Sequence, residues 1–251
     1  MFKKALVLAS TAVSLFAGMN TAVQASDVLR VGTEPTFAPF EFMDTKTRDY
    51  TGYDIDLIKA VAKKAGYKVQ IQNMGFDALI PALKTGTVDV VIAGMSITPE
   101  REKQVDFSAP YYKSGLSYLI RKDEAGKIKS FKNLEGKRIA VQIGNTGAEY
   151  AKNIKGTNVV AFNTTNDAFM DLASTNSDAV ILDRPVLAYF LKTKPAAAKK
   201  MQLSTEIADA EDYGFAVNKG NTKLLNALNK ALEEMKADGE LQKIHDKWFA
   251  N

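Results

Sequence analysis

The order of apolar segments along the chain constrains its fold more than any other feature. Over residues 28–93, short apolar runs of strand length alternate with stretches of helical periodicity, in the order β-α-β-α-β. The run at residues 88–93 is almost continuously apolar, which is typical of a strand buried on both faces of a sheet. The alternation restarts at residue 138 and continues to residue 192. This order predicts an α/β fold with two units of similar plan, each a sheet flanked by helices.

The first 25 residues predict a secretory signal peptide. Lys3 and Lys4 form a basic start, an apolar run follows at residues 5–17, and residues 23–25 carry small side chains where a signal peptidase needs them. The alternative is a short membrane anchor, but the run is shorter than the roughly 20 residues that span a bilayer. We therefore expect cleavage after Ala25, with residues 1–25 removed, and a periplasmic protein.

Composition limits the chemistry that the chain can perform. It has no cysteine and a single histidine, which excludes disulfides, thiol catalysis and Cys- or His-rich metal sites. We expect no metal and no cofactor. Without the two signal-peptide lysines, 31 basic residues stand against 29 acidic ones, a balance that argues against nucleic acid as a partner.

The segment at residues 93–101 is the first of four candidate sites, each of which directly follows an expected strand. Ligands of open α/β sheets bind beyond the carboxyl ends of strands. Gly94 allows close approach to the backbone, and Ser96 offers a hydroxyl. Thr98 begins a helix that places Arg101 in its first turn, where a guanidinium can hold a carboxylate by two parallel hydrogen bonds. The alternative is a capped helix with a surface ion pair.

Two further candidate sites lie in the second unit. At residues 142–149, Gln142 ends a strand and Thr146 lies at a helix start, where free N–H groups attract a small carboxylate. Asp183 closes another strand and could receive an ammonium group. Asp183 could equally be a helix cap, because Asp before a proline-containing first turn is a common helix entry.

The fourth candidate site is a loop at residues 32–42 that is rich in proline and aromatic residues. Its composition suits a rigid loop that presents Glu34 and Phe37, and Phe76 could supply a second aromatic wall. Plain core packing is the alternative for these rings. Together, the four sites offer a guanidinium, carboxylates, hydroxyls and aromatic walls, an inventory complementary to a zwitterion.

Eight stretches of the sequence resemble one known family, the family-3 solute-binding proteins, which are periplasmic amino acid-binding proteins of ABC importers. Glutamine-binding and arginine-binding members are the most similar. The stretches cover essentially the whole mature chain in family order. They lie at residues 32–42, 52–57, 76–83, 93–101, 106–112, 144–147, 238–241 and 247–249.

The resemblance implies the two-lobed type II periplasmic binding protein fold, with two hinge crossings and the ligand between the lobes. Lobe 1 is expected at residues 26–111 plus 214–251, and lobe 2 at residues 115–209. The hinges are then residues 111–115 and 209–213.

The resemblance also implies a role for each candidate residue. Arg101, Ser96 and Thr146 would hold the α-carboxylate of the ligand. Asp183, with the Gly94 carbonyl and the Ser96 hydroxyl, would hold its α-ammonium group. The expected ligand-binding residues are Glu34, Phe37, Phe76, Gly94, Ser96, Arg101, Gln142, Thr146 and Asp183.

In this arrangement, Phe37 and Phe76 sandwich the ligand side chain, and Glu34 and Gln142 reach its end. Glu34 can accept from an amide or pair with a cation, whereas Gln142 can donate to an amide oxygen. Glutamine satisfies both and is the first expectation. Arginine, which would pair with Glu34 by charge, is the alternative, with lysine and histidine behind it.

The expected activity is binding without catalysis. Hinge closure captures a polar L-amino acid, and a membrane permease with an ATPase receives it, the binding protein itself being a monomer. A remote alternative is a dehydratase-like enzyme on the same fold, with Glu34 or Asp183 as general acid. Another alternative is a carrier that serves a separate sensor.

Overall fold

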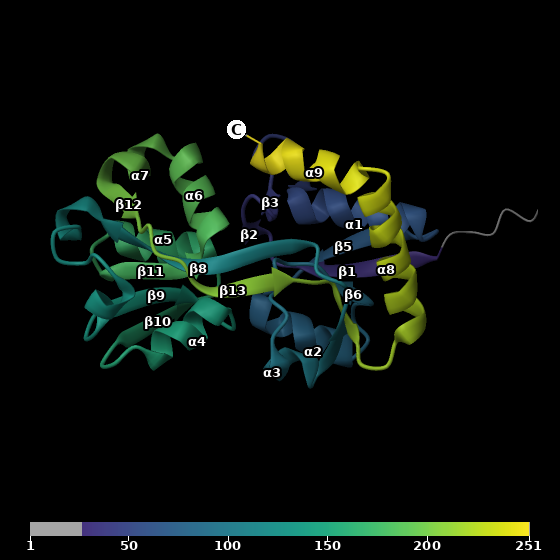
Figure 1. Ribbon diagram of the computed structural model, residues 1–251, viewed down its shortest axis with the longest axis horizontal. Coiled ribbons are helices and arrows are strands. Elements are labelled where there is room, and N and C mark those ends of the chain that lie inside the picture. Colours follow the sequence, from purple (N-terminus) through teal and green to yellow (C-terminus); the bar gives the residue numbers. More distant parts are fainter. Residues whose placement is uncertain (1–26, 251) are drawn as a thin grey trace, which may run out of the picture.

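The computed structural model describes residues 27–250. The expected signal peptide, residues 1–25, lies outside this range. The described chain forms two lobes, each around one β-sheet, and a ribbon of two long strands joins them (Figure 1). The α/β fold with two flanked sheets that the apolar pattern predicts is confirmed.

The first lobe contains a five-stranded sheet. Its amino-terminal strands run parallel to one another, whereas β14 arrives from far along the chain and pairs antiparallel with β6 and β7. The carboxy-terminal part of the chain thus completes the first sheet. In sheet order, the strands are β5 (Lys68–Asn73), β1 (Val28–Thr33), β6 (Val90–Val91), β14 (Ala216–Asn218) and β7 (Val105–Phe107).

Helices cover both faces of the first sheet, which explains the continuous apolar run at residues 88–93 (Figure 1). Val90 packs into one buried cluster and Val91 into another, because successive side chains of a strand point to opposite faces. One face carries α1 (Tyr53–Lys64), α8 (Thr222–Ala237) and α9 (Glu240–Phe249). The other carries α2 (Leu79–Lys84), preceded by the 3₁₀ turn Phe76–Ala78, and the short α3 (Pro99–Glu102).

The second lobe repeats this plan around a six-stranded sheet. Its strands are β10 (Asn158–Phe162), β9 (Arg138–Gln142), β11 (Ala179–Asp183), β8 (Tyr112–Arg121) and β12 (Met201–Leu203), with β13 (Ala208–Tyr213) paired to β8. Its helices are α4 (Thr146–Asn153), α5 (Thr165–Ala173), α6 (Arg184–Thr193) and α7 (Pro195–Lys200). In Figure 1, α4 lies below this sheet, and α5, α6 and α7 lie above it.

The ribbon that joins the lobes consists of β8 and β13. These strands are antiparallel, with Tyr112 opposite Tyr213 and Ser114 opposite Glu211. The sequence marks residues 111–115 and 209–213 only as crossings, whereas the structure shows paired strands there. The lobe boundaries and the hinge role of these residues stay predictions.

The proline-rich loop at residues 32–42 contributes to a small three-stranded sheet beside the first lobe. Its strands are β2 (Thr36–Phe37), β3 (Glu41–Met43) and β4 (Tyr50–Thr51). Within residues 27–250, none of the helices is long and apolar enough to traverse a membrane.

Candidate functional site

Arg101 is directed from the first lobe toward the second. Thr98 caps α3 by accepting from the Arg101 backbone N–H at 3.3 Å, as the sequence predicts. The guanidinium donates to the Ser96 carbonyl at 2.7 Å and, across the lobes, to the Gly144 carbonyl at 3.0 Å. Burial lowers the pKa of Arg101. The guanidinium therefore bridges the lobes, rather than forming the surface ion pair that the sequence left open.

Glu34 and Gln142 meet across the lobes. Glu34 follows β1 and is buried, and Gln142 Nε2 at the end of β9 donates to Glu34 Oε2 at 2.9 Å. Thr36 Oγ1 donates to the same oxygen at 2.8 Å. Burial raises the pKa of Glu34, and these hydrogen bonds oppose the rise. Among residues 27–250, no Lys, Arg or His nitrogen lies within 4.0 Å of this carboxylate.

Ser96 and Thr146 converge on a residue that the sequence does not predict to be in the site. Ser96 Oγ donates to Glu211 Oε2 at 2.5 Å, and Thr146 Oγ1 donates to the same oxygen at 2.9 Å. Burial, reinforced by the charge of Asp183, raises the pKa of Glu211 to about 7. Glu211 is therefore a third buried carboxyl group at the interface of the lobes, beside Glu34 and Asp183.

Asp183 ends β11 and is fully buried. It accepts from the hydroxyl of Tyr213 and, at 3.0 Å, from Ser114 Oγ. Its side chain makes no capping bond to α6, so the structure does not show the helix cap that the sequence left open. The Asp183 Oδ2 atom has no hydrogen-bond partner within residues 27–250 and remains available as an acceptor. Burial raises the pKa of Asp183.

The two predicted aromatic walls are both buried. The ring of Phe37 covers Gly94 so closely that a Cβ atom there would lie 2.7 Å from Phe37 Cε1. Gly94 also has a φ of +53°, a conformation that favours glycine. Phe76 lies under Arg101, with the guanidinium carbon 5.3 Å from the ring centroid. That these rings enclose a ligand side chain stays a prediction.

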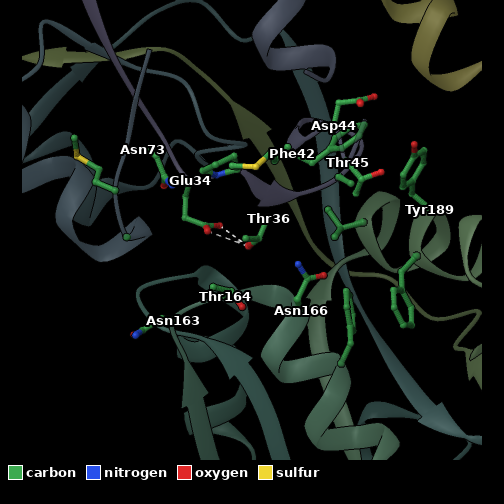
Figure 2. Close-up of a pocket in the computed structure, with 18 of the residues that line it drawn as sticks. Glu34, Thr36, Phe42, Asp44, Thr45, Asn73, Asn163, Thr164, Asn166 and Tyr189 are labelled. Atoms are coloured by element: carbon green, nitrogen blue, oxygen red, sulfur yellow. Dashed lines mark hydrogen bonds between the residues drawn. The ribbon is translucent and has the colours of Figure 1, made fainter. Parts of the chain in front are cut away.

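A cavity of about 850 Å³ opens beside Glu34 (Figure 2). Its walls come from the loops around β2 and β3 on one side and from α5 and α6 on the other. Of the nine predicted residues, Glu34 alone lines this cavity. Small-molecule pockets commonly measure about 300–1,000 Å³. Glu34 thus faces Gln142 and also a space that can accommodate an amino acid side chain.

Comparison with known families identifies the chain. Residues 29–251 match the family described as bacterial extracellular solute-binding proteins, family 3. The chain belongs to this family. The match extends over both lobes and so confirms the resemblance drawn from the eight sequence stretches.

Similar proteins agree with this membership. ABC transporter arginine-binding protein 1 of Escherichia coli K12 is 37% identical over 252 residues, which cover 98% of this chain and 99% of that protein. An ancestral arginine-binding protein bound to arginine superimposes with a TM-score of 0.85 at 47% identity, covering 89% of this chain and 98% of the other. An ancestral arginine-binding protein bound to glutamine gives a TM-score of 0.83 at 46% identity, with the same coverage. The fold is the two-lobed type II fold of periplasmic binding proteins.

Proposed function

We propose that this family member captures a polar L-amino acid in the periplasm and delivers it, as a monomer, to the permease and ATPase of an ABC importer. We further propose L-arginine as the ligand that its cleft fits best. The function is binding without chemical conversion of the ligand. Family membership and the names of similar proteins support the first statement.

The choice of arginine rests on one observation: the carboxylate of Glu34 is buried and has no cationic partner within residues 27–250. A buried carboxylate is costly unless it is paired and hydrogen-bonded. The guanidinium of arginine supplies both the opposite charge and several N–H donors in a planar fork. On ligand binding, the Glu34 carboxylate would either keep its hydrogen bond from Gln142 or exchange it for a hydrogen bond from the ligand.

Charge balance in the cleft favours the same ligand. Asp183 and Glu211 lie near the guanidinium of Arg101, whereas Glu34 has no Lys, Arg or His nitrogen within 4.0 Å among residues 27–250. Arginine adds two positive groups and one negative group, whereas glutamine adds one of each. Glutamine, the first expectation from sequence, satisfies the hydrogen bonds of Glu34 but leaves its charge unpaired. Glutamine is therefore proposed as the weaker ligand.

Contacts between the lobes support capture by closure. Glu34 bonds Gln142, Arg101 bonds the Gly144 carbonyl, and the Thr165 N–H bonds Thr36 Oγ1 at 3.2 Å. Each contact joins a residue of one lobe to a residue of the other. If residues 111–115 and 209–213 act as hinges, a ligand held by both lobes shifts the open–closed equilibrium by its differential affinity for the closed form.

Isothermal titration calorimetry of the ligand-stripped mature protein with each of the twenty amino acids tests the proposal. We expect the tightest binding for L-arginine and weaker binding for glutamine. The absence of any ligand bound more tightly than millimolar would exclude amino acid capture. Preference for an acidic amino acid would exclude the assigned role of Glu34.

A further inference from the structure

The side chain of Glu211 occupies an unusual position, between hydroxyl groups of the two lobes. Glu211 lies on β13, in the ribbon that joins the lobes, and is 9% exposed. Its Oε2 atom accepts from Ser96 in the first lobe and from Thr146 at the start of α4 in the second lobe. One carboxylate oxygen thus links both lobes.

Ser96 and Thr146 are also the residues expected to hold the ligand's α-carboxylate, with the Ser96 hydroxyl directed to the ammonium group. A hydroxyl has one proton to donate, so Thr146 Oγ1 cannot donate to Glu211 and to the ligand's carboxylate at once. Two carboxylates at one site also repel each other, so both cannot stay ionised at low cost. When the ligand enters, Glu211 must therefore move away or take up a proton.

We propose that Glu211 is a built-in competitor of the ligand's carboxylate, which ties the lobes together until the ligand displaces it. This inference rests on the proposed function, because it assumes that Ser96 and Thr146 bind the carboxylate of an amino acid. The ribbon of β8 and β13 would then do more than connect the lobes, because its Glu211 side chain would also set the affinity for the ligand.

The charged and titratable groups around Glu211 show why displacement would depend on pH. Arg101 on α3 favours the ionised form of Glu211, whereas Asp183 on β11 opposes it, and Tyr213 lies two residues further along β13. With the pKa of Glu211 near 7, the group changes charge in the neutral range. Ionised Glu211 competes with the ligand, and protonated Glu211 does so much less.

An alternative is that Glu211 binds the ligand's ammonium group. In the described part of the chain, however, Asp183 Oδ2 is buried and has no hydrogen-bond partner, whereas Glu211 Oε2 already accepts two hydrogen bonds. The two assignments predict opposite effects of removing the charge, because a competitor weakens ligand binding and a partner strengthens it.

Calorimetric titration of wild-type and Glu211→Gln protein with L-arginine at pH 6 and pH 8 separates them. The ratio of wild-type Kd to variant Kd should rise from about 1 at pH 6 to about 10 at pH 8, as the competitor ionises. Taking this ratio cancels the contribution of Glu34, which both proteins share. A ratio independent of pH, or below 1 at both values, would overturn the proposal.

Asp212→Asn is the matched control. It removes the same charge from the neighbouring, exposed position of β13, and we expect it to bind as the wild type does. If Glu211→Gln fails to fold, the wild type alone still tests the proposal. If Glu211 keeps its position and becomes protonated when the ligand binds, calorimetric titration at pH 8 in two buffers of different ionisation enthalpy should show uptake of nearly one proton per ligand. The proposal would be refuted if the ligand binds without proton uptake and a crystal structure of the complex shows Glu211 still hydrogen-bonded to Ser96 and Thr146.

A measurement without ligand distinguishes failure of this proposal from failure of the proposed function. Because the chain has no cysteine, Lys84→Cys and Asn153→Cys give one exposed labelling site in each lobe. Distances between spin labels at these sites should lengthen when Glu211→Ala is added. Unchanged distances would refute the tie between the lobes, whether or not any amino acid binds.

Discussion

Replacing Glu34 by glutamine is the sharpest test of ligand choice. The substitution removes the charge and keeps the shape. The new side chain can still accept from Thr36 and from Gln142, which bond Glu34 at 2.8 Å and 2.9 Å. The fold should therefore be preserved, and a change in affinity should report the charge alone.

The magnitude follows from the surroundings of Glu34. Truncating one member of a buried, hydrogen-bonded charge pair costs roughly 2–5 kcal/mol. The cavity beside Glu34 admits water, so the lower part of this range applies. A loss of about 2–3 kcal/mol corresponds to a roughly 30- to 150-fold weaker Kd for arginine. For glutamine only a neutral hydrogen bond changes, worth about 0.5–1.5 kcal/mol, or a roughly 2- to 12-fold change.

Calorimetry with both ligands on wild-type and Glu34→Gln protein measures the two losses. Asp77→Asn is the matched control, because Asp77 is exposed and lines the same cavity. Removing its charge tests how much the overall negative potential of the cavity contributes to arginine affinity. We expect arginine affinity to fall by no more than a few-fold in the control. Equal losses for arginine and glutamine in Glu34→Gln would refute the charge-pair argument.

Three further predictions concern the rest of the site and its support. Arg101→Ala should remove ligand-induced thermal stabilisation while leaving a folded ligand-free protein, and stabilisation retained in melting curves would place the carboxylate elsewhere. Burial raises the pKa of Asp54 to about 6, so the folded protein holds a proton that the unfolded chain loses, and stability falls by about 3 kcal/mol as pH rises from about 3 to about 7. Asp54→Asn should reduce this dependence in denaturant titrations without removing it, because burial also raises the pKa of the neighbouring Glu41, and an unchanged slope would contradict the assignment. Gly94→Ala should weaken arginine binding by displacing Phe37, whose ring would meet the new methyl group at 2.7 Å, and wild-type affinity would show that this wall is not needed.

The sequence could predict that the site residues come together, because several of them lie at the ends of strands. Glu34 follows β1, Gln142 ends β9 and Asp183 ends β11. Strong local patterns locate these strands, and the carboxyl ends of parallel strands lie at one edge of a sheet. The alternation predicted over residues 138–192 agrees with the strands Arg138–Gln142 and Asn158–Phe162 and the helix Thr165–Ala173.

Glu211 could not be found in this way, because its strand depends on a distant partner. The segment Ala208–Tyr213 is mostly polar, and only pairing with β8 makes it a strand. The one local signal is its period of two, which places Glu211 and Tyr213 on the buried face while Asp212 stays exposed. Which side chain then points between the lobes follows from the twist and pairing of the ribbon.

A crystal structure of the protein with L-arginine tests the central claim most directly. We predict electron density for arginine between the lobes, with its guanidinium on Glu34, its α-carboxylate on Arg101 and Thr146, and its ammonium group on Asp183. Arginine bound with its carboxylate away from Arg101, or absent from the space between the lobes at saturating concentration, would contradict the account.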